Sequence, residues 1–128
     1  MKHTSYPLYV RARDLAGWLA SAENTRAAGA HRTLWEEIGR AGRELLEAVA
    51  LALSFPARRE VHQQAADEAL VRLRERLRLA CDLAGLSRGG LRHASAELDA
   101  IGRMLGGWRK ETRRRRGAGT RAPPARTA

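Results

Sequence analysis

Apolar residues recur at spacings of three and four along most of this chain, and this spacing constrains its fold more than any other feature. Residues three or four apart lie on one face of an α-helix, because a helix turns by about 100° per residue. The first series begins near Pro7, a residue suited to a first helical turn, and runs to about Glu23. Its repeating residues are Leu8, Ala12, Leu15 and Leu19.

A second series predicts a helix from about Thr33 to Ser54. Thr33 and Glu36 have the spacing of a capping box, and Pro56 ends the helix because proline donates no amide hydrogen and restricts the residue before it. The apolar positions of this helix are Leu34, Ile38, Ala41, Leu45, Ala48 and Ala52.

Two further series fill most of the remaining chain. The third covers about 28 residues after Pro56 and ends at Gly85 or at residues 89–90, and the fourth starts after Ser87 and Gly90. The third has a seam of Ala66, Leu70, Leu73, Leu77, Ala80 and Ala84, which Val61, Leu79, Leu83 and Leu86 are expected to widen. The fourth has Leu91, Ala94, Leu98, Ile101, Leu105 and Trp108.

Four amphipathic helices joined by short links predict an all-α, antiparallel up-down four-helix bundle over residues 1–112. Composition agrees, because Val, Ile and Thr together supply only 12 of the 128 residues. Residues 113–128 are expected to form a basic, disordered C-terminal tail, since they combine a run of arginines with glycines and two prolines.

Charge points to an acidic partner. The formal net charge is +10, and residues 109–128 account for +7 of it, with eight Lys or Arg and one Glu. Arginine presents a planar fork of donors that matches phosphate, so nucleic acid is the natural candidate. A chain enriched in arginine only by its overall composition is the alternative.

Two groups of cations are the candidate binding residues. Four arginines alternate with apolar residues in the third helix and form two stripes, which either track phosphates or simply make a solvated face offset by Glu68, Glu75 and Asp82. The second group is the arginine run at residues 113–116 with its neighbours. These cations either bind a polyanion or complement the dipole at the C-terminus of the fourth helix. The candidates are Arg72, Arg74, Arg76, Arg78, Arg103, Arg109, Lys110, Arg113, Arg114, Arg115 and Arg116.

Three glycines within a predicted helix, at 102, 106 and 107, are unusual because each costs about 1 kcal/mol relative to Ala. Gly102 and Gly106 share one face, so we expect close helix packing there beside Trp108, against either another helix of the bundle or another subunit. The alternative is a helix end that frays at residues 106–107.

No residue pattern indicates an enzyme, a metal or a cofactor. The histidines His3, His31, His62 and His93 are about 30 residues apart, and none follows a Glu by three positions, as a di-iron bundle site requires. The single Cys81 is expected to be a small apolar residue of the third helix. No apolar segment approaches the roughly 20 residues of a membrane span, and no secretory signal is seen, so the cytoplasm is expected.

The segment Arg103-Met104-Leu105-Gly106-Gly107-Trp108, preceded by residues 98–102, resembles the closing signature of a family of small four-helix-bundle proteins. These are the accessory variability determinant (Avd) proteins of diversity-generating retroelements. Residues 77–87 are similar to the end of the family's third helix, and residues 9–19 resemble its first. The resemblance covers about residues 6 to 110.

The resemblance implies a non-catalytic partner of a retroelement reverse transcriptase that assembles as a homopentameric barrel. It implies binding to RNA or DNA and support of mutagenic cDNA synthesis and retrohoming. Four-helix bundles encoded within ribosomal RNA intervening sequences share the architecture and are the nearest alternative, together with a general structural or protein-interaction bundle.

Overall fold

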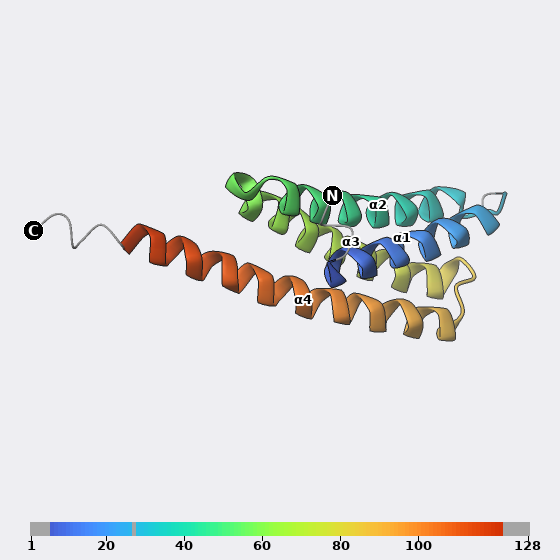
Figure 1. The fold of residues 1–128 in the computed structure, drawn as a ribbon. Coiled ribbons are helices and arrows are strands. Elements are labelled where there is room, and N and C mark those ends of the chain that lie inside the picture. The colour runs from blue at the N-terminus through green and yellow to red at the C-terminus, as the bar shows by residue number, and fades with distance from the viewer. Residues whose placement is uncertain (1–5, 27, 122–128) are drawn as a thin grey trace, which may run out of the picture.

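The computed structural model describes residues 6–26 and 28–121 of the chain. Four helices follow one another: α1 (Pro7–Thr25), α2 (Arg32–Ser54), α3 (Arg59–Leu83) and α4 (Arg88–Arg121), with a single 3₁₀ turn, η2 (Pro56–Arg58), before α3. Each helix packs against the next one along the chain, and α4 closes the bundle by packing against α1. The predicted all-α fold of four helices with antiparallel neighbours is confirmed (Figure 1).

The predicted apolar faces form the core. All four repeating residues of α1 are buried, as are five of the six in α2 and four of the six in α4. The side chains that fill the centre of the bundle are Leu15, Leu19, Trp35, Ile38, Leu45, Leu73, Leu77, Leu98, Ile101 and Leu105. None of the helices, over the ranges described above, has an apolar segment long enough to cross a membrane.

Two predicted details of the second and third helices are wrong. α2 begins at Arg32, next to its predicted start, but Thr33 forms no capping box because it already lies inside the helix. Val61, Leu79 and Leu83, which were expected to widen the seam of α3, are 60%, 45% and 59% exposed. They lie too far round the helix to reach the core, so apolar surface remains on the outside of α3.

The link between α3 and α4 is set by glycine and serine. Gly85 has φ +80°, a conformation that costs other residues strain, and the amide of Leu86 donates to the carbonyl of Ala80 at 3.2 Å. Ser87 caps α4, because its Oγ accepts a hydrogen bond from the amide of Gly90 at 2.9 Å. α3 therefore ends at the first of the two predicted glycine positions, and α4 begins before Gly90.

α4 is much longer than expected and runs past the end of the bundle (Figure 1). The boundary at residue 112 was predicted from the arginine run, but the helix continues through Arg121. Arginine is a good helix former, and Glu111 pairs with Arg114 and Arg115 one turn further on, which offsets the repulsion among the cations. The rest of the predicted tail, residues 122–128, lies outside the described residues.

Candidate nucleic-acid interface

The four alternating arginines of α3 lie at the surface, and each forms an ion pair within the chain. Two reach α2, one reaches α4 and one stays on α3. The pairs are Arg72 with Glu44 at 3.4 Å, Arg74 with Asp99 at 2.9 Å, Arg76 with Glu37 at 3.6 Å and Arg78 with Glu75 at 3.0 Å. Exposed pairs of this kind contribute at most about 1 kcal/mol to stability, so phosphate can replace the carboxylates. In the free chain, however, each of these arginines is paired with a carboxylate.

Most cations near the end of α4 also form ion pairs with carboxylates of the same chain. Arg109 contacts Asp67 at 3.2 Å and donates a hydrogen bond to Gln64 at 2.6 Å, so it ties α4 to α3. Arg116 pairs with Glu60, also on α3, at 2.9 Å. These contacts dock the arginine-rich part of α4 onto the start of α3.

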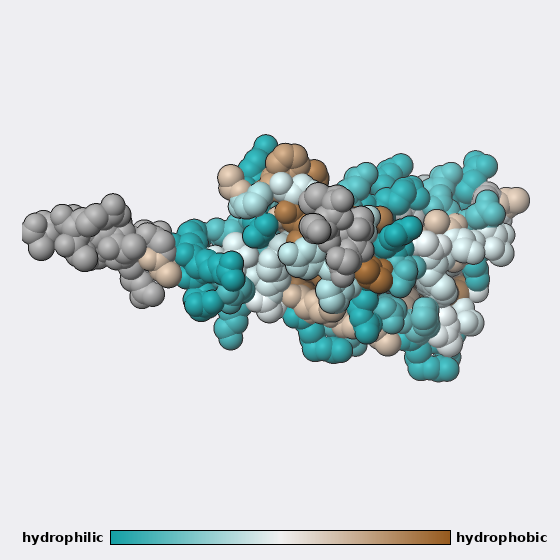
Figure 2. Space-filling view, viewed as in Figure 1, coloured by the Kyte–Doolittle hydropathy of each residue, from teal (hydrophilic) through white to brown (hydrophobic). Residues whose placement is uncertain are grey.

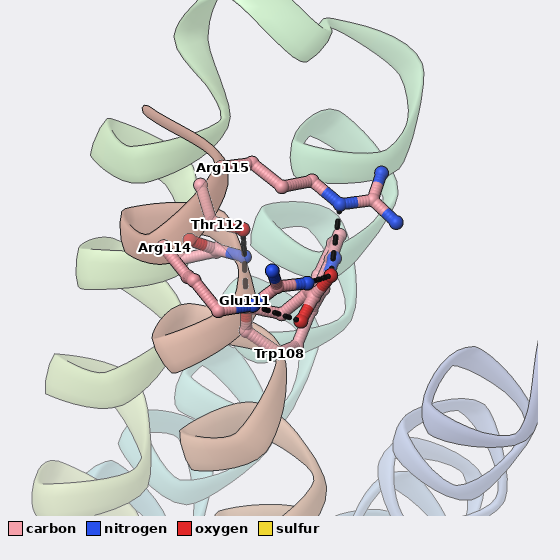
Figure 3. Close-up of polar contacts among 6 residues, drawn as sticks. Trp108, Glu111, Thr112, Arg114 and Arg115 are labelled. Carbon is pink, nitrogen blue, oxygen red and sulfur yellow. Dashed lines mark hydrogen bonds and ion pairs between the residues drawn. The ribbon is translucent and has the colours of Figure 1, made fainter. Parts of the chain in front are cut away.

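Glu111 holds two arginines at once (Figure 3). Its carboxylate accepts hydrogen bonds from Arg114 at 2.6 Å and from the Nε of Arg115 at 2.8 Å. The hydrogen bond from Arg114, then that from Arg115, lowers the pKa of Glu111 below its ordinary value, and the same contact raises the pKa of Arg114. One carboxylate thus faces two guanidinium groups, which leaves a net positive charge here.

Five cations on the outside of α4 have no ion pair among the described residues. Their spacing places them within one arc of the helix, and we call this surface the α4 outer face; its residues are Arg88, Arg92, Arg103, Lys110 and Arg113. All five side chains are exposed. The face extends for about 38 Å, taking a rise of 1.5 Å per residue. Asp99 shares this arc, but it is already paired with Arg74.

Arg88 and Arg92 were not among the residues predicted for the site. The sequence alone could have indicated them, because they are four residues apart and their spacing places them on the same helical face as Arg103 and Lys110. The predicted residues came from the alternating arginines of the third helix and from the arginine run with its neighbours, whereas cations on one face of a helix recur at spacings of three, four and seven.

The predicted close packing at Gly102 and Gly106 is not found within the chain. A Cβ at Gly106 would meet nothing within 4 Å, and one at Gly102 would meet only the guanidinium of Arg74 at 3.7 Å. Of the two partners considered, another helix of the same bundle is therefore excluded. The close approach between helices occurs instead on α2, where a Cβ at Gly42 would lie 2.8 Å from Leu19 of α1.

The aromatic residues divide into core and surface. Trp35 is 1% exposed, its indole nitrogen donates to the carbonyl of Ala84 at 3.1 Å, and Arg26 covers its ring at 4.5 Å. Trp108 is only half-buried, and the guanidinium of Arg59 lies 5.4 Å from its ring centre. Only Trp108, of these two tryptophans, presents its ring near solvent.

No group of three or more His, Cys, Asp or Glu side chains suited to a metal occurs in residues 6–26 and 28–118. Cys81 is a half-buried free thiol beside the core, and His93 packs its ring against Trp18 at 5.1 Å. Comparisons with protein-family models, with curated proteins and with solved structures find no match to this chain.

Proposed function

We propose that this chain is a non-catalytic accessory protein of a diversity-generating retroelement that holds RNA or cDNA on the α4 outer face. Binding of nucleic acid is supported by one observation, the exposed cations of the α4 outer face that have no ion pair with a described residue. Each such cation neutralises a phosphate and releases a counterion without reading a base. Binding is therefore expected to be insensitive to base sequence.

The surface between these cations also suits a phosphate backbone. Gly89, Ala96, Gly106 and Gly107 lie exposed along the same side of α4 and leave no bulky side chain among the cations. A strand can therefore approach the helix closely enough for direct contacts. This arrangement supplies a reason for Gly106 and Gly107, where a Cβ would meet no described residue within 4 Å.

The retroelement assignment rests on the resemblance of residues 98–108 to the Avd family, and it includes assembly as a homopentamer. A ring of five subunits multiplies a weak affinity of each outer face, because the second and later contacts become intramolecular. The exposed apolar residues of α3, Val61, Val71, Leu79 and Leu83, are the surface that we assign to contacts between subunits.

Partner capture tests this proposal. Affinity-tagged chain is expected to retain a reverse transcriptase encoded beside it, and the complex is expected to survive nuclease treatment. Recovery of the chain without polymerase, from cells that express both, would contradict the retroelement role.

A second function, a structural or protein-interaction bundle of the ribosomal intervening-sequence type, is favoured by one observation. The α3 arginines are all matched by carboxylates of the same chain, as expected where charge only keeps a surface soluble. A protein of this kind is expected to show no affinity for RNA or DNA even at low ionic strength.

A further inference from the structure

Two hollows open side by side at the end of the bundle where α2 finishes and α3 begins, and Tyr6 and Trp108 border both of them. The smaller has a volume of about 220 Å³, and apolar side chains, among them Leu53 and Met104, line it. The larger has a volume of about 770 Å³, and the cations around it are Arg58, Arg59, Arg115 and Arg116. An apolar space thus adjoins a cationic one, and the side chains of Tyr6 and Trp108 border both.

These hollows exist because α4 continues past the start of α1 (Figure 1). α1 begins only at Pro7, so the last turns of α4 have α3 but not α1 beside them. Figure 2 shows apolar side chains at the surface near the end of α2, where Phe55 is 52% exposed. Among residues 6–26 and 28–121, no helix covers this apolar surface.

Trp108 lies among several polar contacts. Arg59 lies over its ring and is itself anchored, because its Nε donates to the carbonyl of Ala52 at 2.8 Å. Behind it, the buried Gln63 donates to Thr112 at 3.0 Å, and Thr112 donates to the carbonyl of Trp108 at 2.9 Å. The indole nitrogen donates no hydrogen bond to any residue that the structure describes. Arg59 therefore lies over the ring, and the indole N–H keeps its donor free of described partners.

The cationic hollow keeps free donors. Arg58 is exposed and forms no ion pair with a described residue. Arg115 uses only its Nε to contact Glu111, and the two terminal nitrogens of its guanidinium point away from that carboxylate (Figure 3). The two carboxylates in the lining, Glu60 and Glu111, are both engaged by arginines, so the hollow is net positive.

We infer that the paired hollows bind one nucleotide of a single-stranded nucleic acid, with its base against Trp108 in the apolar hollow and its phosphate facing Arg58 and Arg115. A nucleotide joins a flat, weakly polar ring to an anion, which is the combination that the two hollows present. Aromatic side chains beside cations are the usual means of holding single strands, and every base offers a face for stacking. The inference rests on the proposed function and adds to it a site on the opposite side of α4 from the outer face.

The test compares hexathymidylate and hexauridylate with a deoxyribose-phosphate hexamer that lacks bases. Either oligonucleotide is expected to shift the indole N–H resonance of Trp108, and the abasic chain is not. Trp108→Leu is expected to weaken binding of the base-containing oligonucleotides about tenfold or more, while leaving abasic binding unchanged. Trp18→Leu is the matched control, since Trp18 is a half-buried tryptophan remote from the hollows, and it is expected to bind as the wild type does.

A second pair of variants keeps the test decisive if Trp108→Leu does not fold. Arg58→Gln removes an exposed, unpaired cation and is expected to weaken hexathymidylate binding with an unchanged circular dichroism spectrum. Arg13→Gln makes the same change at an exposed, unpaired position of α1 and is expected to have a smaller effect.

Two results distinguish this inference from the proposed function. If wild-type protein binds hexathymidylate and the abasic hexamer equally, and the Trp108 resonance does not move, the nucleotide site is overturned while the outer face stands. If the wild type binds neither oligomer at low ionic strength, both proposals are overturned.

Discussion

Single carboxylates decide how much of the positive charge of α4 is available to a ligand. Glu111 is the clearest case, because it lies among the cations of the helix end and accepts hydrogen bonds from Arg114 and Arg115. These bonds lower its pKa, so as pH falls Glu111 stays ionised below the pH at which an unpaired glutamate is protonated. At neutral pH it therefore remains a competitor of phosphate for both arginines.

Glu111→Gln is expected to tighten binding of single-stranded RNA or DNA, because it releases two guanidinium groups and adds one unit of positive charge. Fluorescence anisotropy with a labelled homopolymer at fixed salt measures the change. Glu36→Gln makes the same change of charge at an exposed, unpaired glutamate of α2 and is the control. Equal gains from the two variants would mean that Glu111 does not compete with the ligand.

At the scale of the element, α4 combines a continuous core face with an outer face that contains glycines. Its buried face holds it against α1 and α3. A Cβ at Gly106 would meet no described residue within 4 Å, so close packing within the described part of the subunit does not offset the cost of this glycine to the helix. A ligand or a second subunit at this face would explain the residue.

Gly106→Ala tests that explanation. In a lone subunit the added methyl group meets open space and favours the helix, so the free energy of unfolding is expected to rise by about 0.5–1 kcal/mol. Gly17→Ala is the control, since a Cβ at Gly17 of α1 also meets nothing within 4 Å. We expect both variants to be stabilised by urea denaturation at low concentration, and only Gly106→Ala to weaken assembly or nucleic-acid binding. Identical behaviour of the two variants in all three measurements would contradict a role for Gly106 outside the subunit.

The helices were largely predictable from the sequence, because apolar periodicity reports directly which side of a helix is buried. Leu45, Leu73 and Ile101 are buried as their spacing requires. The site was less predictable, because ion pairs between helices depend on how the helices are arranged in space. Glu37, Glu44 and Asp99 are remote in sequence from the α3 arginines that they neutralise, so the pairs appear only once the bundle is built.

The length of α4 and the hollows around Trp108 were unpredictable for a related reason. The arginine run resembles a tail when it is read alone, but Glu60 on α3 and Glu111 within α4 offset its repulsion. Likewise, Trp108 has the spacing of a core residue, and it is only half-buried because α1 begins too late to cover it. The first feature depends on ion pairs of the arginine run, and the second depends on where α1 begins.

At the scale of the whole molecule, the exposed apolar residues of α3 form a surface that does not pack against the other helices of the subunit. Leu79 and Leu83 lie one helical turn apart and are 45% and 59% exposed. Subunit contacts on this surface would remove them from water, and the outer face of α4 would remain free for a polyanion. Assembly and nucleic-acid binding would therefore use separate surfaces.

The double variant Leu79→Glu with Leu83→Glu is expected to convert the proposed pentamer to monomers, because it would place charge in the apolar contact that we assign between subunits. Native mass spectrometry measures the result. Val10→Glu with Leu51→Glu, at two apolar residues each 40% exposed on α1 and α2, is the control and is expected to leave the pentamer intact. Dissociation by the control pair alone would move the subunit contact to another face, and a wild-type monomer would contradict assembly as a ring.

The salt dependence of binding tests the central claim most directly, because phosphate contacts release counterions in proportion to their number. The affinity of wild-type protein for single-stranded RNA is expected to fall linearly with salt on logarithmic axes, with nearly the same slope for different base sequences. Replacing Arg103, Lys110 and Arg113 with Gln is expected to reduce that slope by about two, since each phosphate that is no longer neutralised lowers it by about 0.7. The same substitution at Arg13, Arg32 and Arg40, which are exposed and unpaired on α1 and α2, is expected to change it little. A flat salt dependence in the wild type, or equal slopes for the two triple variants, would contradict the claim that the α4 outer face binds nucleic acid.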